Sequence, residues 1–172
     1  MKRQLHPLLK ACSALPAVLL MCIIFSFSSQ TGEESAGLSY EISSRLVDIG
    51  QSITGEQLSP QEREMRIEAI HTPVRKAAHM SEYCLLALAF SLPLTVYGAR
   101  GMRRFLLALL LSAAFAASDE FHQSFVGGRG PSVMDVGIDS LGAAIGCAAV
   151  AITAGLRRRS AEKKAASQNK EE

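Results

Sequence analysis

The sequence predicts an all-α integral membrane protein with four transmembrane helices. Apolar residues make up 48% of the chain and charged residues 20%, and the two kinds are separated along it. A helix needs about 20 mainly apolar residues to cross a bilayer. Stretches of this kind lie at residues 8–28, 77–97, 104–118 and 133–156. The third stretch is short, so its helix is expected to continue beyond Asp119.

Lysine and arginine gather in three places that lie on one side of the membrane if all four stretches cross it. Loops rich in these residues stay in the cytoplasm. The pattern predicts an N-in, C-in arrangement, with an extracytoplasmic loop at 29–72. The basic residues precede the first stretch, separate the second from the third and follow the fourth: Lys2, Arg3, Lys10, Arg100, Arg103, Arg104, Arg157, Arg158, Arg159, Lys163 and Lys164.

The first stretch has an alternative interpretation as a cleaved secretory signal. Its apolar run is long, however, and Phe25 and Phe27 crowd the cleavage position, which favours a retained helix. Pro16 within this stretch predicts a kink. The cysteines lie in or beside apolar stretches and none lies in an outer loop, so the sequence implies no disulfide framework.

The outer loop is predicted to carry two short helices. A helix that lies on the outer leaflet or on the bundle is indicated by apolar residues at helical spacing. A second short helix is expected from Ser59, with Pro60 in its first position and Glu62 at capping-box spacing. Thr72-Pro73 is expected to start the second membrane helix in the same way. The apolar residues of the first helix are Leu38, Ile42, Leu46, Ile49 and Ile53.

The sequence therefore predicts one membrane domain, residues 8–156, followed by a basic tail at 157–172 that is disordered. The tail is interpreted as a topology signal and a contact for anionic lipid, and not as a nucleic-acid-binding arm.

A cluster of charged and polar residues is predicted at the outer ends of the membrane helices. A charged side chain at the bilayer centre costs about 2.5–3.5 kcal/mol on insertion scales, so such residues are interpreted as functional. Helical spacing places them on shared faces of their helices. The cluster comprises Arg75, Lys76, His79, Glu82, Asp119, Glu120, Gln123, Arg129, Asp135 and Asp139.

Glycines are expected to bring the cluster together. Gly142 and Gly146 follow Asp135 and Asp139 on one helical stripe, and small residues at this spacing let a neighbouring helix approach closely. The fourth helix would then press its carboxylates against the polar faces of the second and third. Asp135 could instead be part of an N-terminal cap with Ser132.

Three interpretations of the cluster remain open. Arg75, Lys76 and Arg129, together with helix N-termini, could hold an anion such as a lipid headgroup. The same charges could form a salt-bridge lock that only stabilises the bundle. In a catalytic scheme, His79 would be a base oriented by Glu82, or Asp119 and Glu120 would act as acid and base.

No cofactor and no metal are predicted. His79 with Glu82, Glu120 with His122, and the two aspartates of the fourth helix are plausible ligand types, but the neighbouring cations would repel a metal ion.

Several motifs together resemble the VanZ-like family of membrane proteins. They are RKAAHMSEY at 75–83, DEFHQSFVGGRG at 119–130 and the stripe from Asp135 to Gly146. The polar FSSQ segment at 27–30 adds to the resemblance, which covers about residues 10–156. This family usually has Pro-Gly where this chain has Gly127-Gly128, and has Asn or Asp at position 139.

The resemblance implies a multi-pass protein of the bacterial plasma membrane whose functional face is extracytoplasmic. Some members confer low-level resistance to teicoplanin, a glycopeptide antibiotic. The expected partner is therefore a membrane lipid or lipid-linked cell-wall precursor, bound by the cluster. A membrane-embedded hydrolase or transferase that acts on such a lipid is the alternative, and so is a structural scaffold.

Overall fold

The computed structural model describes residues 7–130 and 132–168, and every regular element in that part of the chain is an α-helix. Four helical segments are long and apolar enough to cross a membrane: Pro7–Ser28, Pro60–Val96, Gly101–Gln123 and Val133–Gln168. The predicted all-α fold with four spans is confirmed. The helices are α1 (Pro7–Cys12), α2 (Leu15–Ser28), α3 (Gly32–Thr54), α4 (Pro60–Val96), α5 (Gly101–Gln123) and α6 (Val133–Gln168).

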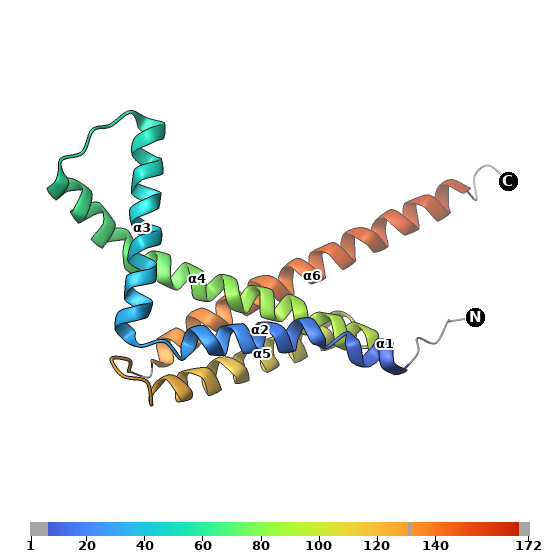
Figure 1. Cartoon of the computed structure of the whole chain (residues 1–172). Coiled ribbons are helices and arrows are strands. Elements are labelled where there is room, and N and C mark those ends of the chain that lie inside the picture. Colours follow the sequence, from blue (N-terminus) through green and yellow to red (C-terminus); the bar gives the residue numbers. More distant parts are fainter. Residues whose placement is uncertain (1–6, 131, 169–172) are drawn as a thin grey trace.

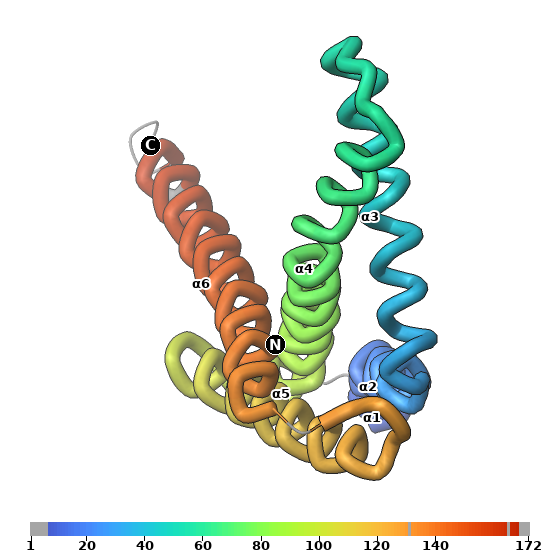
Figure 2. The backbone as a smooth tube through the Cα atoms, turned by 90° about the vertical axis from the view of Figure 1, so that its left-hand side faces the viewer, coloured from blue at the N-terminus to red at the C-terminus, as the bar shows by residue number. Residues whose placement is uncertain are grey.

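The spans form a bundle with two different ends (Figure 1). The described ends of the chain and the α4–α5 turn lie at one end. The α5–α6 loop and the base of α3 lie at the other, called here the α3 end. Viewed along the bundle, α4 and α6 diverge as a V above α5 (Figure 2). Helix α3 stands across the axis of α2 and is not a span.

The first span is broken near the predicted kink. Helix α1 ends at Cys12 and α2 begins at Leu15, with Pro16 in its first turn. Proline has no N–H to donate to the carbonyl four residues earlier. The chain closes the gap with turn bonds from the Ser13 and Ala14 N–H groups.

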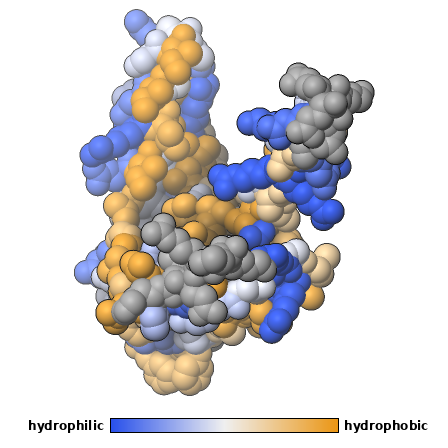
Figure 3. All heavy atoms as spheres, turned by 90° about the vertical axis from the view of Figure 1, so that its right-hand side faces the viewer, coloured by the Kyte–Doolittle hydropathy of each residue, from blue (hydrophilic) through white to orange (hydrophobic). Residues whose placement is uncertain are grey.

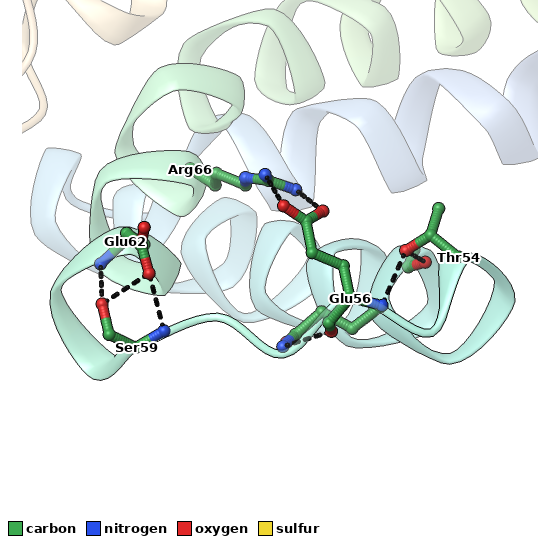
Figure 4. A network of polar contacts seen from close by, with 7 residues as sticks. Thr54, Glu56, Ser59, Glu62 and Arg66 are labelled. Atoms are coloured by element: carbon green, nitrogen blue, oxygen red, sulfur yellow. Dashed lines mark hydrogen bonds and ion pairs between the residues drawn. The ribbon is translucent and has the colours of Figure 1, made fainter.

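The structure of α4 shows that one predicted helix boundary, at Thr72-Pro73, is wrong. The capping box of Ser59 and Glu62 is present as expected, and Glu56 pairs with Arg66 beside it at 2.6 Å (Figure 4). The helix does not restart at Thr72, however, but runs unbroken through Pro73. An internal proline costs about 3 kcal/mol. Packing on both sides, against α3 before Pro73 and against α6 after it, holds α4 together.

Two other helices extend further than their apolar stretches. Helix α5 continues past Asp119 to Gln123, as expected. Helix α6 continues to Gln168, so the segment 157–168 is helical where disorder was predicted. Ala, Arg, Lys and Glu dominate this segment and are strong helix formers. Arg158 also pairs with Glu162 one turn later at 2.9 Å. The rest of the predicted tail, 169–172, lies outside the described residues.

The bundle core is built from small side chains. Alanine, cysteine and glycine let the helices approach closely, as is typical of helix packing in lipid. A Cβ on Gly142 would collide with the backbone of Met80, and one on Gly146 with the carbonyl of Cys84. The close approach of α4 and α6 depends on these glycines. The buried core comprises Ile24, Tyr83, Leu86, Ala87, Ala108, Ala116, Ala143 and Cys147.

Helix α3 is the predicted amphipathic helix, but its apolar stripe does not pack on the bundle. Its buried residues are Ser39, Ser43 and Val47. It is tied to α4 by the Asp48–Arg63 ion pair at 2.9 Å. The Arg63 guanidinium lowers the pKa of the Asp48 carboxyl from its ordinary value. The apolar residues of the stripe are all exposed: Leu38, Ile42, Leu46, Ile49 and Ile53.

Candidate functional site

A polar cavity of about 290 Å³ lies at the α3 end of the bundle. Its walls come from α4, α5, α6 and the α5–α6 loop, which brings together most of the cluster predicted from the sequence. Asp119 and Glu82 do not line it. The polar cavity is lined by His71, Thr72, Arg75, Lys76, His79, Glu120, Gln123, Gly128, Arg129, Gly130, Asp135, Ile138 and Asp139.

One column of α4 supplies much of the polar cavity. His71, Arg75 and His79 recur every four residues, which places them one above another on a helix. This column exists because α4 does not restart at Thr72. The same continuity corrects an expectation: Arg75 and Lys76 lie inside a helix, so no helix N-terminus at Pro73 can help them to hold an anion.

The α5–α6 loop holds Arg129 over the polar cavity. The Gly32 N–H donates a hydrogen bond to the Gly127 carbonyl at 3.1 Å, and a Cβ on Gly32 would collide with the Gly128 carbonyl. Gly128 has φ +75°, a conformation that favours glycine. The loop is thus fastened to the start of α3, and this contact fixes the backbone position of Arg129.

The guanidinium of Arg129 is buried without a protein partner. Its Nε and Nη1 atoms are buried from solvent and donate no hydrogen bond within the described part of the chain. Burial, followed by the nearby Arg75, lowers the pKa of Arg129 from its ordinary value. A buried cation without a partner is costly, so this group is suited to an anionic ligand.

The carboxylates of the site mostly have partners of their own. Glu120 Oε2 accepts the Ser132 backbone N–H at 2.9 Å, near the start of α6. Ser132 Oγ in turn accepts the Asp135 N–H at 3.2 Å, the arrangement of a helix N-cap. Glu120 and Ser132 therefore cover the N-terminus of α6.

His79 stands between two carboxyl groups. Its Nδ1 atom is 3.9 Å from Asp139 Oδ1 across the α4–α6 crossing. Glu82, the partner that the sequence suggested for His79, lies in a separate groove together with His79 and Arg75. The tertiary structure thus assigns Asp139 and not Glu82 to the polar cavity.

A second layer of polar groups lies beneath the polar cavity. Asp119 is 3% exposed and accepts a hydrogen bond from Gln123 at 3.2 Å, with Ser28 beside it. Tyr83 is fully buried. Its hydroxyl, Asp119 Oδ1 and Asp139 Oδ1 have no hydrogen-bond partner in the described residues. Polar atoms of three helices, α4, α5 and α6, therefore lie in the core.

Ion pairs are sparse in the site. Among the described residues, Arg75, Lys76 and Arg129 form no salt bridge; His79–Asp139 is the contact that the cluster contains. In the same part of the chain, no three His, Cys, Asp or Glu side chains group closely enough to hold a metal ion.

Sequence reasoning missed His71 and Thr72 as members of the site. A signal for His71 was available in its four-residue spacing from Arg75, but the expected helix start at Thr72 hid it. Tyr83 belongs to the RKAAHMSEY motif and shares a helical stripe with Lys76 and His79, but its burial depends on how α4 meets α5 and α6.

Comparison with known proteins places the chain in a family. No curated protein and no solved structure matches it. The sequence model described as VanZ/LLP1 matches residues 13–154. This range contains most of the first span, the second and third spans, the fourth span up to its basic end, and the whole polar cavity. The chain therefore belongs to the VanZ/LLP1 family of VanZ-like proteins.

Proposed function

We propose that the polar cavity binds the anionic headgroup of an envelope lipid or lipid-linked cell-wall precursor. The observation that carries this proposal is the Arg129 guanidinium, which is buried beside the cavity with Nε and Nη1 unpaired. Arg75 and Lys76 line the same space from α4. Planar guanidinium groups form paired hydrogen bonds with phosphate and carboxylate oxygens.

Three carboxylates also line the cavity, but none of them forms an ion pair with Arg75, Lys76 or Arg129 in the described residues. Glu120 accepts the Ser132 N–H, Asp139 lies 3.9 Å from His79, and Asp135 stands in the first turn of α6. The three cations therefore remain available to a ligand. A salt-bridge lock, the structural alternative, would require them to pair with the carboxylates, so the sparse ion pairing favours ligand binding.

The family and the four spans support a place in the bacterial plasma membrane, with the polar cavity on the extracytoplasmic side. The basic segments Lys10, Arg100–Arg104 and Arg157–Arg159 all belong to the opposite end of the bundle, which is cytoplasmic by the positive-inside rule. At that position the site would meet lipids of the outer leaflet. Binding of a cell-wall precursor there would lower the access of teicoplanin to its target.

A second candidate function is hydrolysis or group transfer at the bound headgroup. It is favoured by the His79–Asp139 contact at 3.9 Å, because a carboxylate beside an imidazole orients it as a base. Asp119 and Glu120 are further candidates for acid and base. Binding needs the cations alone, whereas catalysis also needs His79.

Lipid binding by the purified protein tests the proposal. Arg129→Gln removes the charge and keeps a polar side chain. Arg45→Gln is the control, because Arg45 lies outside the polar cavity, where it is exposed on α3 and paired with Glu41. Hydrogen bonds to charged groups contribute about 1.5–3 kcal/mol, so Arg129→Gln should weaken binding of phosphatidylglycerol by about tenfold or more. Native mass spectrometry with phosphatidylglycerol and phosphatidylcholine measures this. Equal binding by wild type and Arg129→Gln would overturn the proposal.

A further inference from the structure

A narrow groove opens beside the polar cavity, between α3 and α4. It measures about 70 Å³, against about 290 Å³ for the polar cavity. Both spaces share Arg75 and His79, which form the wall between them. This side groove is too small for a second headgroup. It is lined by Ser35, Leu38, Ser39, Ile42, Val74, Arg75, Ala78, His79 and Glu82.

The side groove opens on the apolar side of α3. At about 100° per residue, the exposed stripe of α3 lies about 100° around the axis from the face that packs on α4. Leu38 and Ile42 belong to the stripe, and Ser39 belongs to the packed face. The side groove contains residues of both faces, so its mouth lies between them.

The apolar stripe of α3 faces the layer that the four spans cross. Helix α3 stands across the spans (Figure 1). Seen from the end where the termini lie, the α3–α4 hairpin presents a continuous apolar stripe (Figure 3). Glu41, Arg45 and Asp48 are all exposed. They lie on the side of α3 opposite the face that packs on α4, about 90° around the axis from the apolar stripe. Helix α3 thus has three faces: one packs on α4, one is apolar and one is charged. This pattern is typical of a helix that lies in a bilayer interface.

We infer that the ligand is a chain-bearing phosphate that enters sideways from the leaflet: its headgroup occupies the polar cavity, and the first segment of its apolar chain occupies the side groove. This inference rests on the proposed function and adds the class of ligand and its route. A soluble phosphate would use the polar cavity alone. The shared wall of Arg75 and His79 lies where headgroup and chain join.

Two neighbouring alanines of α4 allow a matched test. Ala78 lines the side groove, whereas Ala77 lines a different groove on the other side of α4, and both are exposed. Ala78→Leu fills the side groove, and Ala77→Leu adds the same atoms elsewhere. The probes are dodecyl phosphate and inorganic phosphate, titrated against the purified full chain in phosphatidylcholine nanodiscs.

Ala78→Leu should weaken dodecyl phosphate binding by about tenfold, because burying roughly two CH₂ groups contributes about 0.8 kcal/mol each. Inorganic phosphate should bind to wild type, Ala78→Leu and Ala77→Leu alike, which also shows that the variants are folded. Equal dodecyl phosphate binding by the two leucine variants would overturn the inference.

A second variant separates failure of the inference from failure of the proposed function. Arg129→Gln should weaken both probes, because both use the polar cavity. If Arg129→Gln leaves inorganic phosphate binding unchanged, the proposed function fails and the inference falls with it. If Arg129→Gln weakens both probes but Ala78→Leu weakens neither, the headgroup site stands and the side route is wrong.

Discussion

At the scale of single residues, small side chains decide where the functional groups lie. Gly142 lets α6 approach the backbone of Met80, one residue after His79. Asp139, one turn before Gly142, is thereby brought to 3.9 Å from His79. The contact between His79 and Asp139 thus depends on the absence of a methyl group one turn away.

Gly142→Ala should destabilise the protein, because the added Cβ collides with backbone atoms that cannot rotate away. Overpacking of this kind costs about 1–3 kcal/mol. Thermal unfolding in detergent measures the change. Gly137→Ala is the matched control, since nothing lies within 4 Å of a Cβ there, and it should be neutral or slightly stabilising. Equal melting temperatures for the two variants would contradict the close crossing of α4 and α6.

Arg129 has no protein partner for its guanidinium in the described residues, but its loop is held in place. Its loop is fastened to α3 by the Gly32–Gly127 hydrogen bond, so the position of the guanidinium is supported from outside the site. A site whose cation is held in place in advance loses less freedom when a ligand binds. Gly128, next in the loop, adopts φ +75°, a conformation that favours glycine.

At the scale of elements, α3 is organised by three faces. One packs on α4 through Ser39, Ser43 and Val47, one is charged, and one is apolar and exposed. The capping box of Thr31 and Glu34 starts the helix immediately beside the loop that carries Arg129. Helix α3 therefore connects its exposed apolar stripe to the loop that carries Arg129.

A tryptophan can report the depth of each face, because the chain contains none. Leu46 is 47% exposed on the apolar stripe. Glu41 is exposed on the charged side, five residues earlier and about 140° around the helix axis. In vesicles, the fluorescence of Leu46→Trp should shift to the blue and be quenched by brominated acyl chains. Glu41→Trp should emit like a tryptophan in water. Similar spectra for the two variants would rule out an interfacial position for α3.

At the scale of the whole molecule, the two ends of the bundle differ in chemistry. One end carries basic segments and the described ends of the chain, and the other carries the polar cavity, the side groove and α3 (Figure 1). Helix α4 has 37 residues, about 55 Å at 1.5 Å per residue, whereas a bilayer core is about 30 Å thick. Its first turns therefore stand outside the lipid core, next to α3.

Expression in a teicoplanin-sensitive Gram-positive host tests the cellular role. Wild type should reduce susceptibility to teicoplanin, and Arg129→Gln at matched membrane levels should not, because it lacks the cation that holds the headgroup. Susceptibility measurements with a vector control report this. Protection by Arg129→Gln equal to that by wild type would contradict a role for the polar cavity.

His79→Gln in the same host separates binding from catalysis. If binding is sufficient, His79→Gln should protect like wild type, and the lipid mass profile should be unchanged. Loss of protection in a variant that still binds phosphatidylglycerol would favour the hydrolase or transferase instead.

The sequence by itself determined the four spans, the amphipathic period of α3, the capping box at Ser59 and most of the residues of the polar cavity. These features depend on local composition and spacing, which act over one or two helical turns. The continuity of α4 through Pro73 and the helical state of 157–168 were not predicted. A local proline signal cannot report the packing of distant helices that offsets it.

Only the tertiary structure decided which polar residues meet. It brought Asp139 rather than Glu82 to the side of His79 in the polar cavity, left the Arg129 guanidinium without a protein partner, and added His71 to the site. It also turned the apolar stripe of α3 away from the bundle. Each outcome depends on how close two helices approach and at what angle they cross, and that is set by side chains far apart in the sequence, such as Gly142 and Met80.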